Sequence, residues 1–475
     1  MSELVRFGGG GETAITLAAG IAVALAILLI LLLPRKYVVV PFLLAILLIP
    51  IGEKIVVGGI HLMMFRVVLF FGGFRLLISL MIPSSNGAKF RMNSIDWAVI
   101  LWCISSVITF TVLWGEWQAL INRIGFVYNT IGGYFIFRFL LHDEEDVDRV
   151  TRLFAVICAI VAVCMTVEYL TGRNAFSYFG GVATFSRARD GNIRAQGPFE
   201  HPLLAGTFGA TLLPLFLGLW WQERKYKGTA ILGVISATIM AILCWSSTPL
   251  LAYAAGIGAL FFWPFRKKMR PLRWGAALSL IALHLVMKAP VWALIARADV
   301  VGGSSGYHRY ELVNMFIRNF GEWWLLGTKN SGAWGWDMFD TSNQYVETGV
   351  TGGLLTLIIF IAIIVYCFKG LGIARENEEA KGNSAAERRL WVLGAALFST
   401  AVAFLGISYF DQTVFLWYCL LAMIAALTFS ADAARHAATE SDRSFHFAAM
   451  GPSNRPALTN ARTENRFLRH FPPRV

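Results

Sequence analysis

The chain has 475 residues, of which 57% are hydrophobic and 15% are charged. Soluble domains carry about 25% charged residues, so this composition excludes an ordinary soluble globular protein. The formal net charge is +12. Much of this excess lies in short segments between apolar runs, where positive charge orients membrane helices, so nucleic acid is not an expected partner.

The apolar residues are grouped in blocks of roughly 20, the length of helix that crosses a hydrocarbon core of about 30 Å. They predict an all-α fold, a polytopic transmembrane helical bundle of about 12–13 spans. The blocks are residues 13–33, 37–51, 60–82, 95–114, 120–141, 150–170, 202–221, 229–246, 248–264, 272–289, 350–368, 388–408 and 412–430. The third block contains Arg66 and Arg75, which either extend toward the membrane surface or face a polar cavity.

Lysine and arginine residues in short loops predict the orientation of these spans. With the N-terminus outside, the inside loops hold 18 such residues, whereas the short outside segments hold only Arg6 and Lys54. The same alternation places two long loops, 171–200 and 290–349, on the outer face. Residues 1–430 are then a membrane domain, and the small, polar, arginine-containing residues 431–475 are expected to form a disordered cytoplasmic tail.

The first long loop ends in a basic stretch, "RARDGNIRAQGPFEHPLLAG", at residues 187–206. Arg187, Arg189 and Arg194 fall within eight residues, just before the apolar run that starts at Pro202. Any one of these arginines is explained equally well as solvated surface charge. As a group on the outer face, against the usual charge distribution, they favour an anion-binding role.

The second long loop contains a predicted amphipathic helix. Leu312, Met315, Phe316 and Phe320 recur at helical spacing, so we expect this helix to lie along the membrane surface with its apolar side down. His308 and Arg309 stand at its start, and Asp337 and Asp340 precede the return to the membrane. Each of these polar residues alone has an ordinary explanation, such as solvation or helix capping. Together with the arginines of the first loop they predict a polar external site.

These features resemble the membrane glycan ligase and polymerase superfamily, which includes O-antigen ligases and O-antigen or exopolysaccharide polymerases. Three local patterns carry the resemblance: "RAQGPFEHPLLAG", "HRYELVNMFIRNFGEWWLLGT" and "DTSNQYVETGVTGG". The first is similar to the family's R-x-x-G before a helix, and places Arg194 on a functional arginine. The second places Arg309 on another. The third is similar to the family's re-entry segment, with Asn343 followed by Glu347, Gly349 and a further glycine.

One position departs from the ligase pattern. In O-antigen ligases the residue before the asparagine is a histidine with a catalytic role, and here it is Ser342. Polymerase-like members more often carry an aspartate nearby, and Asp340 lies two residues before Ser342. The sequence therefore favours a polymerase, with an O-antigen ligase as the alternative.

The resemblance implies a GT-C-like, metal-independent glycosyltransferase without a cofactor, located in the bacterial inner membrane with its loops in the periplasm. Its substrate would be a polyprenyl-diphosphate-linked oligosaccharide, and membrane lipid and other polysaccharide assembly proteins would be its partners. Fixed arginines suit the charge that develops on a diphosphate leaving group. The expected catalytic residues are Arg194, Arg309, Asp340 and His308, and the expected substrate-binding residues are Arg187, Arg189, His201, Asn343 and Glu347.

Other polar motifs point less clearly to chemistry. "DEEDVD" at 143–148 contains an Asp-x-Asp pair that suits either a metal or, more simply, the start of a helix on the inner side. "SSTP" at 246–249 predicts a tight external turn. The six cysteines all lie in apolar stretches without a CxxC pair, so we expect packing residues.

Two other classes of protein also have many membrane helices. A transporter or flippase would explain the spans and the intramembrane arginines, but such proteins often show two related halves, and no convincing repeat is visible in this sequence. A membrane scaffold without enzymatic activity would leave the arginine-rich loop and the Arg309 segment unexplained. We therefore rank the enzyme first and the transporter a distant second.

Overall fold

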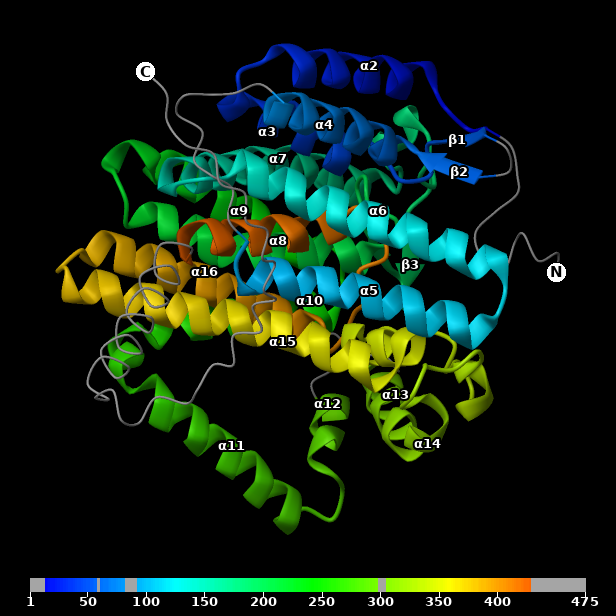
Figure 1. Cartoon of the computed structure of the whole chain (residues 1–475), viewed down its shortest axis with the longest axis vertical. Helices are drawn as coiled ribbons and strands as arrows, with labels where there is room; N and C mark the ends of the chain where they lie inside the picture. Colours follow the sequence, from blue (N-terminus) through cyan, green and yellow to red (C-terminus); the bar gives the residue numbers. More distant parts are fainter. Residues whose placement is uncertain (1–12, 58–59, 82–91, 298–304, 429–475) are drawn as a thin grey trace, which may run out of the picture. The chain divides into compact units, whose positions relative to one another are not determined.

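The computed structural model describes residues 13–57, 60–81, 92–297 and 305–428, and these are mostly helical (Figure 1). Before the first long loop the helices are α2 (Leu17–Leu32), α3 (Arg35–Leu48), α4 (Met64–Met81), α5 (Ser94–Trp114), α6 (Trp117–Leu140) and α7 (Glu144–Thr171). After it come α8 (Pro202–Trp220), α9 (Lys227–Leu243), α10 (Ser247–Phe261), α11 (Met269–Val286), α15 (Gln344–Ala380), α16 (Ser384–Ala403) and the last helix, Val414–Thr428. The tail predicted at 431–475 lies outside the described residues.

Five helices in the described ranges are long and apolar enough to cross a membrane: α5, α7, α8, α9 with the turn before it, and α15. A sixth span results if α10 and α11, which are bent by 73° at a short break, are counted as one. Each of the thirteen predicted blocks overlaps a helix, although several of these helices are shorter than the predicted block. The prediction of an all-α membrane-type fold is confirmed at this level.

The centre of the fold is α8, almost every residue of which is buried. It packs against α7, α9, α10 and α16, while α5 packs against α6 and α15 (Figure 1). Because α8 follows directly after the arginine-rich stretch, this buried helix holds the end of the first long loop.

The predicted start of the span 60–82 is wrong. Residues Ile60–Met63 form strand β2, which pairs antiparallel with β1 (Lys54–Val57), and helix α4 starts only at Met64. A short apolar run has no periodicity that separates a strand from a helix, which explains the error. Both arginines of α4 are hydrogen-bonded within the protein: Arg66 donates to Asn129 Oδ1 (3.1 Å), and Arg75 donates to the carbonyl of Leu31 (2.7 Å) at the end of α2.

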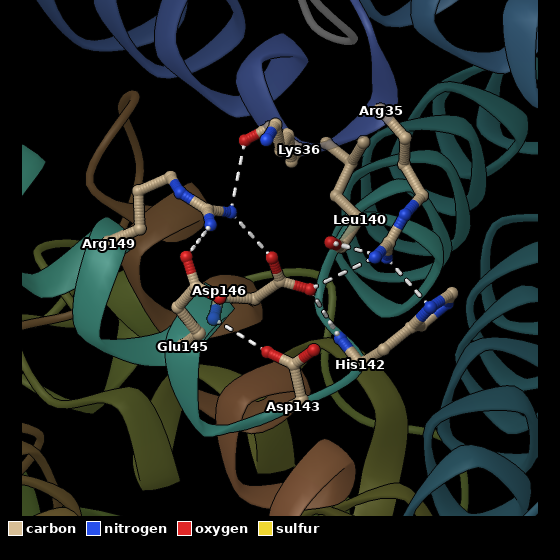
Figure 2. A network of polar contacts seen from close by, with 8 residues as sticks. All are labelled: Arg35, Lys36, Leu140, His142, Asp143, Glu145, Asp146 and Arg149. Carbon is tan, nitrogen blue, oxygen red and sulfur yellow. Dashed lines mark hydrogen bonds and ion pairs between the residues drawn. The ribbon is translucent and has the colours of Figure 1, made fainter.

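The acidic run at 143–148 starts α7, and this interpretation of "DEEDVD" is confirmed. Asp143 is the N-cap residue and accepts the N–H of Asp146 (2.8 Å). Figure 2 shows how the Asp146 carboxylate then binds Arg149 (2.6 Å) and Arg35 (3.4 Å), which joins α7 to α3. The next acidic residue, Asp148, pairs with Arg389 of α16 (3.1 Å). These carboxylates therefore tie helices together on the side predicted to be cytoplasmic.

Helix α15 is interrupted at Gly353, whose φ of 73° and ψ of −177° are not helical. The segment 324–328 fills the break, because Thr328 N–H donates to the Val350 carbonyl (2.8 Å) and Leu354 N–H donates to the Trp324 carbonyl (2.8 Å). Only glycine adopts this backbone conformation readily. The glycine-rich "ETGVTGG" is thus the place where the second long loop is anchored to the membrane helix.

The predicted boundary between the last two spans is wrong. The spans 388–408 and 412–430 leave only residues 409–411 between them, but the structure has a longer non-helical segment there. Helix α16 ends at Ala403 and the last helix begins at Val414, so residues 404–413 form a non-helical segment. The first part of this segment is rich in apolar and aromatic residues (Phe404, Leu405, Ile407, Tyr409 and Phe410), so its hydropathy resembles that of the helices on either side. A hydropathy pattern shows where apolar residues continue along the chain, but it does not show where a helix ends within such an apolar stretch.

Candidate functional site

The three arginines of the first long loop lie on a short antiparallel hairpin. Strand β3 (Arg187–Arg189) pairs with β4 (Asn192–Arg194), and Arg187 stands directly opposite Arg194. Asp190 and Gly191 connect the strands with φ values of 51° and 79°, a combination typical of a type I′ turn. The hairpin therefore brings guanidinium groups from both ends of the arginine-rich stretch together.

Arg194 is only 6% exposed, and its Nε donates to the carbonyl of Cys244 (3.2 Å) at the end of α9. Burial lowers the pKa of Arg194, and the nearby charges of Arg189 and Arg187 lower it further. A buried cation next to two others is electrostatically unfavourable by itself. An anion bound between these guanidinium groups would relieve that repulsion.

His201 is the N-cap residue of α8, and its Nδ1 accepts the N–H of Leu203 (3.1 Å). Burial lowers the pKa of His201 to about 3, with further lowering by Arg194, Arg187 and Arg189. His201 is therefore neutral at physiological pH, with Nδ1 used as a hydrogen-bond acceptor. The first group of site residues is thus Arg187, Arg189, Arg194 and His201, next to the N-terminus of α8.

Sequence reasoning missed Glu168, the residue that holds this hairpin. Glu168 lies near the end of α7, is fully buried, and accepts the N–H groups of Gln196 (3.1 Å) and Gly197 (2.8 Å) and the hydroxyl of Ser186 (3.1 Å). The residues just before β3 and just after β4 are thereby bound to one carboxylate. A glutamate inside a predicted apolar span was the available signal, because ionised residues are costly in such a position.

The second group lies around the start of α13 (Ser305–Arg318). The Nε2 of His308 is 3.1 Å from the carbonyl oxygen of Asp337 and 3.9 Å from its carboxylate. Burial raises the pKa of Asp340, whereas the nearby charges of His308 and Arg309 lower it and that of Asp337 raises it. The structure thus brings together His308, Arg309, Asp337 and Asp340, as the sequence predicts.

Glu347 belongs to this second group and connects it to α6. Its carboxylate accepts a hydrogen bond from the Thr341 hydroxyl and lies within electrostatic range of Asp340 and Arg123. Arg123 comes from the first third of α6, and its guanidinium carbon lies 3.7 Å from the centre of the Phe110 ring. Arg123 is an isolated arginine within a predicted span, so the sequence alone assigns it no role.

Asn343, an expected substrate-binding residue, caps the start of α15 in the structure. Its Oδ1 accepts the N–H groups of Tyr345 (3.0 Å) and Val346 (3.1 Å), and its Nδ2 donates to the Leu405 carbonyl (3.0 Å). Asn343 is 2% exposed. Its side chain acts as the N-cap of α15, so its contribution to the site is to fix the position at which that helix begins.

Part of the predicted apolar side of α13 packs on protein, which corrects the prediction that this side faces the membrane surface; Phe320, at the start of α14 (Phe320–Trp323), is 44% exposed. Leu312 and Phe316 are buried in a small core with Trp323, Trp334 and Val350. The Phe316 and Trp323 rings are stacked with their centres 3.9 Å apart. The second long loop therefore has its own hydrophobic core, which fixes His308 and Arg309 relative to α15.

Across the described parts of the chain, no group of three His, Cys, Asp or Glu side chains is arranged to hold a metal ion. The chemistry that the two groups offer is that of fixed cations, carboxylates and imidazoles. Comparison with known proteins adds no assignment: the chain matches no protein-family model and no curated protein.

Proposed function

We propose that this protein is a membrane glycosyltransferase that joins polyprenyl-diphosphate-linked oligosaccharide units into a surface polysaccharide. The observation that carries the proposal is the hairpin of Arg187, Arg189 and Arg194 beside the N-terminus of α8. Arginine binds phosphate oxygens in bidentate geometry, and a helix N-terminus also favours an anion. A diphosphate attached to a long lipid combines an anionic head with a tail that suits an apolar helical body.

In the proposed reaction the bond between the anomeric carbon and the diphosphate oxygen breaks, and a bond from that carbon to an acceptor hydroxyl oxygen forms. The leaving group is the lipid diphosphate, whose developing negative charge Arg194 and Arg309 stabilise. The acceptor hydroxyl loses its proton to a base, for which Asp340 is our first choice. Burial raises the pKa of Asp340, which strengthens it as a base, and His308 is the second choice.

Arg123 and Glu347 support the second group in this proposal. Glu347 lies between Thr341 and Arg123 and shares the electrostatic environment of Asp340. Ser342 occupies the position at which the ligases carry a catalytic histidine, so we favour a polymerase that extends a glycan over a ligase that transfers it to another acceptor.

We further propose that the shorter apolar helices also cross the membrane, which gives a GT-C-like bundle of about 12–13 spans with both groups on the periplasmic face of the bacterial inner membrane. The distribution of lysine and arginine supports this orientation. The ion pairs of Asp146 and Asp148 lie at the opposite, cytoplasmic end in this arrangement. Membrane lipid and other polysaccharide assembly proteins would be its neighbours.

The proposal is tested with purified protein in proteoliposomes supplied with a lipid-diphosphate-linked oligosaccharide. A ladder of products that differ by one oligosaccharide unit is expected, in the presence of a chelator as well as in its absence. Arg194→Ala should abolish the ladder, and Arg318→Ala, which changes an exposed arginine of α13, should preserve it. Transfer of a single unit to a separate acceptor without a ladder would instead identify a ligase, and the absence of any transfer would contradict the proposal.

A further inference from the structure

The non-helical segment 404–413, which the sequence does not reveal, is hydrogen-bonded to residues that are near both groups in the chain: Asn343 and Gln344 on one side, and Pro198 and Glu200 on the other. On one side it binds the start of α15, because Asn343 Nδ2 donates to the Leu405 carbonyl (3.0 Å) and Gln344 N–H donates to the Phe404 carbonyl (2.9 Å). Tyr409 N–H in turn donates to Gln344 Oε1 (2.9 Å). These bonds fix the segment to Asn343 and Gln344, which lie between Asp340 and Glu347 in the chain.

On its other side the segment binds the end of the first long loop. Glu200 N–H donates to Asp411 Oδ2 (3.1 Å), and Gln412 Nε2 donates to the Pro198 carbonyl (2.8 Å). Asp411 and Gln412 are 2% and 1% exposed. The two bonds therefore fix residues 198–200, which connect Arg194 to His201, from within the protein.

The segment is itself held in place. Asp411 Oδ1 accepts the N–H of Thr413 (2.8 Å), which starts the last helix, and the Thr248 hydroxyl of α10 donates to the Gly406 carbonyl (3.3 Å). A Cβ atom at Gly406 would lie 2.4 Å from Thr248 Oγ1, so this contact depends on glycine. Residues 404–413 thus form a rigid connection between two loops that are far apart in the sequence.

We propose that residues 404–413 set the relative position of the two groups, and that Asp411 and Gln412 are positioning residues for the transferase reaction. This inference rests on the proposed function, because it assumes that the arginines of one group and the base of the other act on one substrate. Neither side chain needs to contact the substrate. A displacement of about 1 Å between reacting groups can reduce the rate about 100-fold, so the connection affects kcat more than substrate affinity.

Gln412→Met is the primary test because it removes the bond to Pro198 with little change in size. The Oε1 of Gln412 is buried without a hydrogen-bond partner, so methionine removes no other bond. Gln222→Met is a matched control. Its Nε2 also donates one bond, to Asp148 (2.9 Å), and its Oε1 is likewise buried and unpartnered, but Gln222 lies between α8 and α9. Asp411→Asn is the second variant.

Two measurements are made on each variant. The first is the distance distribution between spin labels at Tyr178→Cys and Trp336→Cys, which are 85% and 90% exposed in the first and second long loops. Cys164 is replaced by serine in this background because the other five cysteines are buried. The second is kcat and KM for glycan extension in proteoliposomes.

For Gln412→Met and Asp411→Asn we expect a broader distance distribution and a kcat about tenfold lower, with KM within about twofold of wild type. Gln222→Met should change neither. An unchanged distance distribution in Gln412→Met overturns the inference whatever the activity, and so does a broadened distribution with full activity. If the wild-type protein extends no glycan, the proposed function fails while the distances still report whether the segment joins the loops. Should Asp411→Asn fail to fold, Gln412→Met alone decides.

Discussion

Arg187 and Arg194 stand directly opposite each other across the β3–β4 hairpin. Like charges in this relationship destabilise a strand pair. Arg187 is exposed and Arg194 is buried, so the repulsion falls on a group that water screens poorly. The hairpin is therefore built at a cost in stability that an anion would remove.

Arg187→Ala should raise the melting temperature of the ligand-free protein slightly, because one member of the repulsive pair is lost. The same variant should show a smaller increase in melting temperature when inorganic pyrophosphate is added. Thermal unfolding in detergent with and without pyrophosphate measures both effects. A ligand-free Arg187→Ala protein that melts lower than wild type, with an unchanged response to pyrophosphate, would contradict the anion-binding interpretation.

His201 makes the stability of the protein depend on pH. In the unfolded chain its pKa is near 6.5, and in the folded chain burial and the arginines lower it to about 3. As the pH falls, the unfolded state therefore binds a proton before the folded state does, so we expect His201 to lower the free energy of unfolding by about 1.4 kcal/mol per pH unit between pH 6.5 and about 3. Asp411 acts in the opposite direction, because burial raises its pKa from 3.8 to about 6, so its stabilising contribution is lost as the pH rises through 6.

His201→Asn separates the two effects. Asparagine also caps a helix but does not titrate in this range. The variant should lose less stability than wild type when the pH is lowered from 6.5 to 4.5, as measured by thermal unfolding. Parallel pH profiles for the two proteins would show that His201 accepts a proton in the folded state.

Glu168→Ala should displace the arginine hairpin. It leaves the N–H groups of Gln196 and Gly197 without their acceptor, at a cost of about 1–3 kcal/mol for each buried group. We expect a lower melting temperature and loss of glycan extension, with partial recovery in Glu168→Gln. Glu145→Ala on the same helix is the control, because its side chain is 79% exposed. Equal effects of Glu145→Ala and Glu168→Ala would remove the argument for a positioning role.

Gly353→Ala should prevent the break in α15 from forming. A Cβ atom at this position would lie 2.5 Å from the Leu325 carbonyl oxygen, and the φ of 73° is unfavourable for any other residue. We expect little folded protein by size-exclusion chromatography. Gly372→Ala in the same helix meets no atom within 4 Å and should be neutral or slightly stabilising. Normal yields of both variants would contradict our description of the break.

The sequence predicts the presence of the helices well because each contains an apolar block, and several of their ends are recognisable. Asp143 and Pro202 mark the starts of α7 and α8, and the structure agrees within a few residues. The sequence also predicts one polar site that includes His308, Arg309 and Asp340, and the structure places these three residues within electrostatic range of one another.

What the sequence could not predict depends on contacts between distant segments. Glu168 and Arg123 appear in the sequence as single polar residues in apolar runs, and only the fold reveals their partners. Residues 404–413 are hidden for a different reason, because the apolar and aromatic residues at 404–410 continue the hydropathy of the neighbouring helices. The side chain of Asn343 caps the start of α15. A sequence motif alone does not distinguish a capping asparagine from one that binds substrate.

The most direct test of the proposed function is the length of the polymer in cells that carry Arg194→Ala or Arg309→Ala, at protein levels equal to wild type. Arg318→Ala is the control. We predict that polymer is lost in both variants, that single lipid-linked oligosaccharide units accumulate, and that the control remains near normal. Polymer of normal length and amount in both variants would contradict the proposed site and the transferase function built on it.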